Sequence, residues 1–394
     1  MINIPISEPT GSAPSAPQWR AFLEMGFRPL YLAGGFWALV SIALWVYLPQ
    51  HLSGLLPGLY WHAHEMLWGF VATIAVGFLF TAVSNWTGVN PLHGKPLGGI
   101  TLLWVAARAC YLLPGVATFW IGFAAETAFF ALAAVALGKA VYASPTSRNY
   151  GVPILVGMLG LLNALYLLAA WQGRFEQIMQ IYNAGLIIMA LIAVLISRRV
   201  IPFFASRAIA GLDIPMLAAS GRWQLGAGAL AIILILLDQR SAAGVALAAV
   251  GVIAVAQIIA WKPWAVLRKP ILWILYLGYT SLGIGLIVAA LQFLGVSSLR
   301  AAWSVHIIGV AGFSVLIIGM ITRTALGHLG RMLQTDRSMV LSYLLIITAA
   351  VLRLIALLPG EHVQACLHAS AGAWVLGFAL YLWRFTPWMI RPRM

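Results

Sequence analysis

The chain has 394 residues, of which 62% are hydrophobic and 8% are charged, and its formal net charge is +14. Soluble proteins carry about 25% charged residues, so this composition excludes a soluble globular protein and predicts a polytopic membrane protein in a lipid bilayer. The positive charge does not indicate a nucleic-acid partner. The Lys and Arg residues lie in the gaps between apolar stretches, where such residues set membrane topology.

Residues 1–20 are rich in Pro and Ser and lack the pattern of a signal peptide, so we expect a disordered N-terminal tail. Residues 21–394 are expected to form a single transmembrane domain. It contains a series of apolar stretches of about twenty residues, the length of a helix that crosses a bilayer. The predicted fold is an all-α, polytopic membrane helix bundle of about twelve helices. The predicted spans are residues 29–49, 62–84, 97–114, 117–138, 151–171, 177–197, 221–237, 241–260, 271–294, 301–322, 338–358 and 363–384.

Basic residues separate the two sides of this predicted bundle. Eighteen Lys and Arg residues lie before the first span, in every second gap or after the last span, whereas the alternate gaps contain only Arg174, Arg240 and Arg300. Because basic residues stay on the cytoplasmic side, both termini are expected to be cytoplasmic. The longest gap, residues 198–220, mixes Arg with Ile, Phe and Pro, and we expect it to lie along the cytoplasmic interface.

Most histidines lie near the outer ends of the spans, together with a few charged residues. Imidazole and charge inside a bilayer are costly, so they indicate a functional site. Histidine is the commonest metal ligand and a usual axial ligand of haem iron, and arginine binds carboxylates such as the haem propionates. The sequence therefore predicts a cofactor site in the outer half. Its candidate cofactor-binding residues are His62, His64, His306, His362, His368, Arg108 and Arg353.

The run WHAHEM at the start of the second span leaves two arrangements open. His62 and His64 are about 200° apart around a regular helix, so only one would face a given site. If His62 precedes the first helical turn, both could bind one ion. Glu65 and Met66 are expected to support the ligands from the same turn. Each histidine could instead be a hydrogen-bonding packing residue.

The role of Arg108 is also open. It could bind a haem carboxylate, or it could pair with Glu126, because a tight turn around Pro114 joins their two spans. Glu126 lies near the middle of its span and is a further candidate for supporting the site.

A second polar run, Arg323 to Arg331, ends the tenth span on the cytoplasmic side. Two glycines flank His328, which predicts a tight turn with a helix end capped by Gly. The run is either a second histidine site or gate, supported by Arg323 and Arg331, or a structured turn with anchoring charges. His328 follows His306 by 22 residues, about 33 Å along a straight helix, so the two cannot share one small site. The candidate metal ligands are thus His62, His64, His306 and His328.

Several runs of this sequence resemble the NnrS family of bacterial inner-membrane proteins. They are FRPLYL at 27–32, WHAHEMLWGF at 61–70, FLFTAVSNWTG at 78–88, SRRVIPFF at 197–204 and ITRTALGHLGR at 321–331. The resemblance implies a multi-spanning protein of the bacterial inner membrane that binds haem and copper and is linked to nitric oxide and nitrosative stress. It also implies that His62, His64, Glu65, His328 and Arg331 occupy the family's signature positions. Ser197 and Arg198 depart from the glycines expected there.

Three functions are consistent with these observations. The first is a haem protein, with copper as a further cofactor, that binds nitric oxide and protects against nitrosative stress. The second is a redox enzyme like the haem–copper oxidases, in which helices two and ten hold a haem. Here spans two and ten carry His, but spans six and seven carry none. The third is a multi-pass transporter of a metal or small solute. The sequence does not establish enzymatic activity or oligomeric state.

Overall fold

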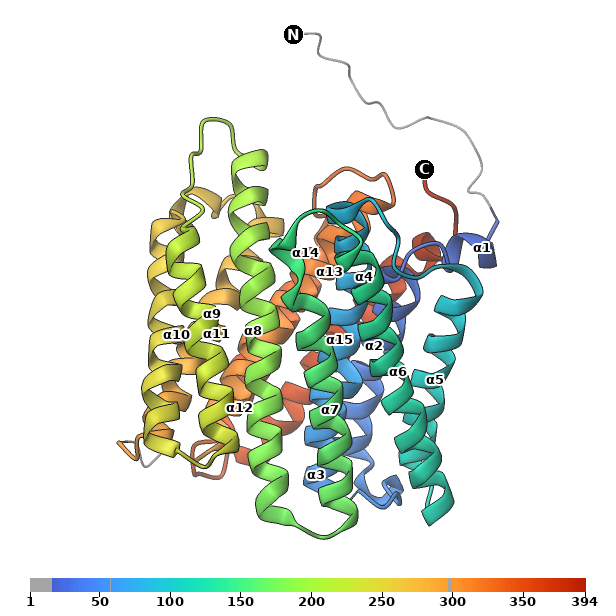
Figure 1. Cartoon of the computed structure of the whole chain (residues 1–394), viewed down its shortest axis with the longest axis vertical. Coiled ribbons are helices and arrows are strands. Elements are labelled where there is room, and N and C mark those ends of the chain that lie inside the picture. The colour runs from blue at the N-terminus through green and yellow to red at the C-terminus, as the bar shows by residue number, and fades with distance from the viewer. Residues whose placement is uncertain (1–15, 57, 297–299) are drawn as a thin grey trace.

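Long helices run side by side through the whole bundle (Figure 1). The computed structural model describes residues 16–56, 58–296 and 300–394, and these residues form helices and connecting turns without strands. Each of the twelve predicted spans coincides with one helix or one continuous helical stack. These are α2 (Phe27–Tyr47), α3–η2–α4 (Gly58–Thr87), α5 (Gly94–Leu112), α6 (Val116–Tyr142), α7 (Gly151–Trp171), α8 (Phe175–Ala208), α9 (Ala218–Leu236), α10 (Arg240–Ala260), α11 (Pro270–Phe293), α12–η5–α13 (Ala302–His328), α14 (Arg337–Ile355) and α15 (Val363–Met389).

Among the described residues, eleven of these helices are long and apolar enough to cross a membrane. The twelfth, α5, carries Lys95 and Arg108 and lies against α6 in the same bundle. The predicted class, a polytopic helix bundle, is therefore confirmed. Short helices complete the chain: α1 (Trp19–Phe22), η1 (Pro49–His51), η3 (Ser147–Asn149) and η4 (Pro263–Val266).

One predicted boundary is wrong. Residues 198–208, expected along the cytoplasmic interface, continue α8 to Ala208, with Pro202 inside the helix. The basic and aromatic residues of this segment lie on the last three turns of α8, where Phe203 and Arg207 are exposed and Arg198, Arg199 and Phe204 are half-buried.

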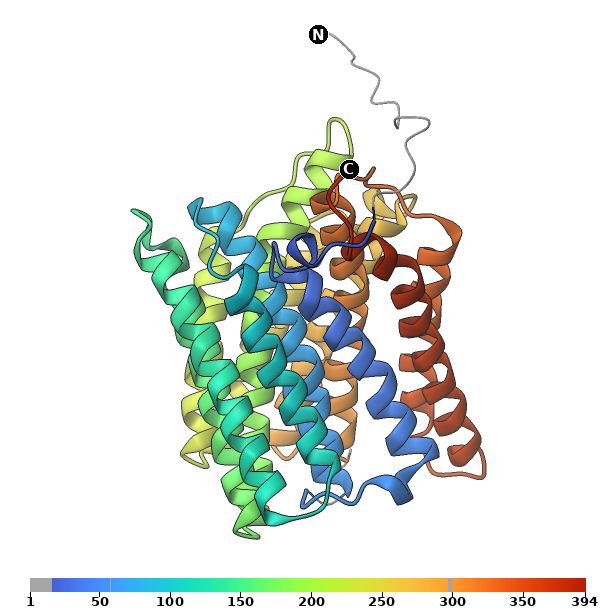
Figure 2. The same cartoon turned by 90° about the vertical axis from the view of Figure 1, so that its right-hand side faces the viewer.

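Both described ends of the chain lie at the same end of the bundle (Figure 2). The backbone N–H of Gln18 donates to the carbonyl of Ile390 at 2.8 Å, and α1 follows at once. The tail expected over residues 1–20 lies mostly outside the described residues, and its last part, from Gln18 on, belongs to the fold. An even number of crossings agrees with this arrangement. We call this end the terminal end.

Two helical stacks form the centre of the bundle. The share of the most apolar stretch that is buried inside the bundle is 94% in α3–η2–α4 and 78% in α8. The same share is 33% in α9 and in α14. Both central stacks also contact η5 or α13. A residue on α3–η2–α4 therefore has protein on every side, which is why polar side chains there can find partners away from lipid.

Both histidine-bearing stacks contain a π-helical segment. These segments are η2 (Glu65–Ala72), which follows His64, and η5 (Ile307–Ser314), which follows His306, and they contact each other. A π-helix inserts extra backbone into a turn and rotates the residues before it relative to those after it. Such segments are frequently found at functional sites.

Candidate functional site

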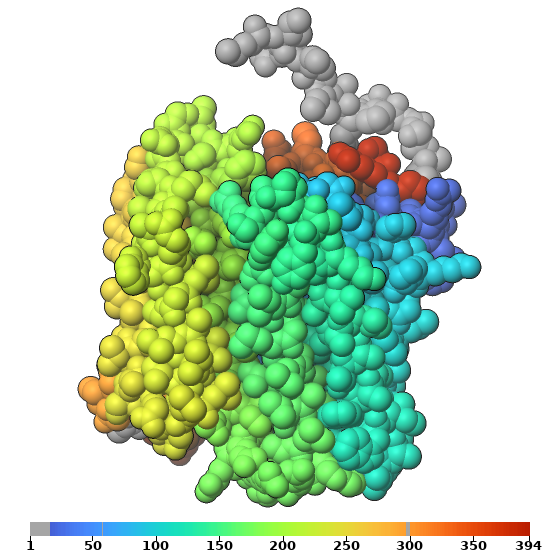
Figure 3. Space-filling view, in the orientation of Figure 1, coloured from blue at the N-terminus to red at the C-terminus, as the bar shows by residue number. Residues whose placement is uncertain are grey.

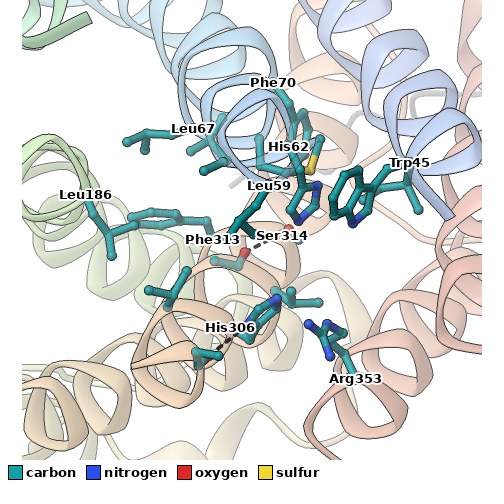
Figure 4. Close-up of a pocket in the computed structure, with 18 of the residues that line it drawn as sticks. Trp45, Leu59, His62, Leu67, Phe70, Leu186, His306, Phe313, Ser314 and Arg353 are labelled. Carbon is teal, nitrogen blue, oxygen red and sulfur yellow. Dashed lines mark hydrogen bonds between the residues drawn. The ribbon is translucent and has the colours of Figure 1, made fainter. Parts of the chain in front are cut away.

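A cavity of about 310 Å³ lies at the end of the bundle opposite the terminal end (Figure 4). It is enclosed by α2, α3–η2, α8, α12–η5, α14 and α15, and its walls are mainly aliphatic and aromatic, including Phe70, Phe313 and Trp374. Ligand pockets are typically about 300–1,000 Å³, apolar, with a few polar groups that orient the ligand. The polar groups here are chiefly His62, His306 and Arg353, and we call this space the histidine cavity.

His62 lies flat against an aromatic wall of the cavity. Its ring stacks on Trp45 with centroids 5.1 Å apart and planes 8° from parallel. Within the described residues, Nδ1 of His62 is buried without a hydrogen-bond partner. A buried imidazole normally bonds through both nitrogens. This ring therefore has coordinating or hydrogen-bonding capacity that the protein itself does not use.

His306 faces the same cavity from α12. Its Nδ1 lies 2.7 Å from the carbonyl oxygen of Ala302, one turn earlier. Because a carbonyl only accepts, Nδ1 carries the hydrogen in this bond, and Nε2 of the neutral ring keeps its lone pair. This is the tautomer in which histidine binds a metal through Nε2, with the other nitrogen fixed by a backbone carbonyl.

Arg353, on α14, brings a positive charge to the same space (Figure 4). Among the described residues no carboxylate lies within ion-pair distance of it, whereas Arg28, Arg108 and Arg384 each have such a partner. A cation at membrane depth without a counter-charge is costly. The cavity therefore suits a ligand with an anionic group.

Behind the wall that carries His62 lies a fully buried group that we call the charge cluster: His64, Glu65, Arg108 and Glu126. Arg108 donates to Glu65 Oε2 at 2.5 Å and to Glu126 Oε1. The two nitrogens of His64 lie 2.9 Å from Glu65 Oε1 and 3.2 Å from Glu126 Oε2. The four side chains thus form a closed ring of alternating charge.

The ring balances its own charge. Ionised carboxylates only accept hydrogen bonds. When the imidazole of His64 is protonated, both of its nitrogens act as donors to them. Two carboxylates then face one guanidinium and one imidazolium. Asn163 adds a contact at 2.8 Å between its Oδ1 and His64 Nε2. Both cationic side chains are paired with carboxylates inside the cluster, and neither lines the histidine cavity.

The structure decides the question of WHAHEM that the sequence left open. His62 and His64 point to different places, His62 into the cavity and His64 into the charge cluster. Met66 lines the cavity beside His62, and Glu65 belongs to the cluster. The predicted Arg108–Glu126 pair is present, extended by Glu65.

Two of the outer histidines lie apart from the cavity. His362 is exposed just before α15. His368 stacks on Tyr47, with ring centroids 5.6 Å apart, and lies 3.3 Å from the side-chain nitrogen of Gln364. α15 contributes Leu367, Ser370 and Ala371 to the cavity, while His368 turns to the surface.

The residues of the second polar run lie at the terminal end. His328 is 3.4 Å from Asn85 Nδ2 and packs on Phe27. Arg323 stacks over Phe204 at 3.8 Å and Arg331 over Trp388 at 3.6 Å. Gly330, with φ +77°, ends the helix as the sequence predicts. These residues brace the turn and are far from His306.

Metal coordination by several protein ligands is not apparent in the described ranges. In residues 16–56, 58–296 and 300–394, no three His, Cys, Asp or Glu side chains gather as a possible metal site. His62 and His306 are therefore available as single ligands on different walls of one cavity. Such a pair suits a cofactor that brings its own equatorial ligands.

Sequence reasoning missed three residues that shape the site. Trp45 positions His62, Trp37 donates to Glu65 Oε2 at 2.6 Å, and Asn163 joins the charge cluster. A polar residue in an otherwise apolar span was the available signal, but its depth and rotation depend on how α7 packs.

Fold and cavity together define the class: a polytopic all-helical membrane protein with a histidine-lined cavity between its helices. The family model for NnrS protein matches residues 21–393, nearly the whole chain. The chain belongs to the NnrS family. Among curated proteins, none matches it.

Proposed function

We propose that this protein is a haem-binding protein of the bacterial inner membrane that responds to nitric oxide, with the haem in the histidine cavity. His62 and His306 would hold the haem iron through their ring nitrogens, and Arg353 would bind a haem carboxylate. The apolar walls, including Phe70 and Phe313, would cover the porphyrin and exclude water.

One observation carries this proposal: two imidazoles with unused nitrogens face a single apolar cavity from two contacting helices. The orphaned Nδ1 of His62 and the unpaired charge of Arg353 would each gain a partner from a bound haem. His64 and Arg108 are not assigned to the haem, because the charge cluster already engages them.

Nitric oxide is the proposed gaseous ligand, as the family resemblance implies. Bound haem would supply a ferrous iron to which nitric oxide binds. The residues around it would set access, because Leu67, Leu186 and Phe313 offer an uncharged gas an apolar surface while disfavouring ions.

Copper has less support than haem. Among the described residues no three His, Cys, Asp or Glu side chains gather as a possible metal site. The proposal is therefore made for haem, and copper remains a further candidate.

Haem content of purified variants tests the proposal. The protein is purified in detergent from haem-replete cells, and haem per chain is measured together with the reduced-minus-oxidised spectrum. We expect a Soret band that shifts with nitric oxide in the natural protein, and loss of most haem in His62→Ala and His306→Ala.

His368→Ala is the matched control, because this histidine also lies near the outer end but faces away from the cavity. It should keep the full haem content. A colourless natural protein from haem-replete cells would refute the proposal, and so would equal haem loss in all three variants.

A further inference from the structure

A second, smaller cavity of about 60 Å³ lies beside the histidine cavity, on the side of the terminal end. It is lined by the same helical stacks, α3–η2–α4, α8 and η5–α13, with Tyr31 from α2. We call it the small cavity. No residue of the charge cluster lines it, and neither does His62, His306 or Arg353.

The two cavities follow one another along these three stacks. Val71 on η2 and Phe313 on η5 line both. On α8 the lining passes from Leu186 in the histidine cavity to Met189 in the small cavity, one turn further on. The boundary between the cavities therefore includes two apolar side chains, which can change rotamer without breaking a hydrogen bond.

The lining of the small cavity selects the chemistry of its occupant. Apart from the hydroxyl groups of Tyr31 and Ser197, its side chains present carbon and sulfur, and none is charged. An ion or polar solute would lose its hydration there without replacement. Apolar cavities remain dry and bind apolar guests such as xenon, whereas one water occupies about 30 Å³ of liquid. With a volume of about 60 Å³, the small cavity admits only a small guest molecule.

We propose that the small cavity binds a small uncharged gas molecule. We further propose that it is an intermediate binding site on an apolar track, by which we mean a route for the gas into the histidine cavity. The binding itself depends only on the size and apolarity of the cavity. The role as a track rests on the proposed function, because only a bound haem gives the gas a destination.

Xenon is the probe for the binding site. Crystals of the full chain are equilibrated with xenon gas, and its anomalous scattering is located. We expect a xenon peak between α4, α8 and α13 in the natural protein. In Ala193→Leu the peak should be lost, because Ala193 lines the small cavity and the larger side chain fills it.

Ala229→Leu is the matched control. It makes the same change at an exposed position of α9, a helix that lies on an outer face of the bundle (Figure 3), and should keep the xenon peak. If Ala193→Leu does not fold, Ala75→Val fills the same cavity from α4 with a smaller change. Ordered water in the cavity, or no xenon in the natural protein, would overturn the proposal.

Carbon monoxide rebinding after photolysis tests the track in haem-loaded protein. We expect Ala193→Leu to slow the rebinding and Ala229→Leu to leave it unchanged. Equal rates would overturn the track. If the natural protein holds no haem, the proposed function fails, but the xenon experiment still decides whether the small cavity is a gas site.

Discussion

His62 and His64 are separated by one residue, yet they belong to two different environments. His62 has unused nitrogen and faces a cavity, whereas His64 is held between two carboxylates. The two histidines therefore have different roles. His62 is free to bind a ligand, and His64 helps to neutralise the charges that fix this part of the bundle.

The charge cluster should act as one unit in stability. Glu126→Gln keeps the shape of the side chain but leaves a buried positive charge without balance. Breaking a buried pair in this way costs about 3–5 kcal/mol. We expect a loss of that size in the free energy of unfolding, measured by denaturant titration in mixed micelles.

Asp336→Asn provides the comparison for this variant. Asp336 pairs with Arg384 at 2.7 Å, but about a third of each side chain is exposed. Exposed pairs contribute about 0–1 kcal/mol, and Asn still caps α14. The double variant Arg108→Gln/Glu126→Gln restores neutrality and should recover part of the loss. If Glu126→Gln costs no more than Asp336→Asn, the cluster is not a balanced unit.

At the residue scale, the sequence predicted part of the site. The pairing of Arg108 with Glu126 was one of the two roles that the sequence left open for Arg108, and the short turn between their spans was its basis. The separation of His62 from His64 followed from helical geometry, although the direction of each did not. The part played by Asn163 depends on packing between α7 and α3, which no local pattern encodes.

At the scale of elements, a π-helix follows each of the two cavity histidines, η2 after His62 and η5 after His306. η2 lies between the cavity and the charge cluster, and Gly69 lies within it. A Cβ at Gly69 would meet Arg108 Nη1 at 2.5 Å, Glu65 Oε2 at 2.6 Å and Trp37 Nε1 at 2.9 Å. Glycine is therefore needed for the cluster to close against the helix.

Gly69→Ala should destabilise the protein by about 1–3 kcal/mol, because overpacking forces buried groups apart. Gly99→Ala on α5 is the control, since a Cβ there has nothing within 4 Å, and alanine in a helix is favoured over glycine by about 1 kcal/mol. Thermal unfolding in detergent measures both. Equal midpoints would show that the cluster tolerates a displacement of η2.

The helices themselves were predictable and their internal irregularities were not. Apolar length located all twelve segments, because a bilayer imposes that length. The same apolar run is compatible with α- and π-helix alike, so η2 and η5 left no signal. The extension of α8 to Ala208 was missed because Pro202 and the adjacent Arg residues read as a loop.

On the scale of the whole molecule, the two ends of the bundle differ in chemistry. The terminal end carries His328, Arg323 and Arg331, stacked on aromatic side chains or held in a turn. The opposite end carries the histidine cavity and the charge cluster. The small cavity extends the apolar lining from there toward the terminal end, and no charged side chain lines it.

This distribution explains why composition and charge predicted the class of protein, a polytopic membrane protein, but not the residues that line the histidine cavity. Basic residues in alternate gaps predict an even number of crossings, and the described ends do lie together. The gathering of His62, His306 and Arg353 requires α3, α12 and α14 to converge, although they are far apart in the sequence. Only the packed bundle brings them to one cavity.

A density map of the full chain, purified from haem-replete membranes, tests the central claim most directly. We predict a planar density in the histidine cavity, in contact with His62 or His306 and with an anionic group near Arg353. An empty cavity in a haem-containing sample, or haem density at His328 or His368, would contradict it.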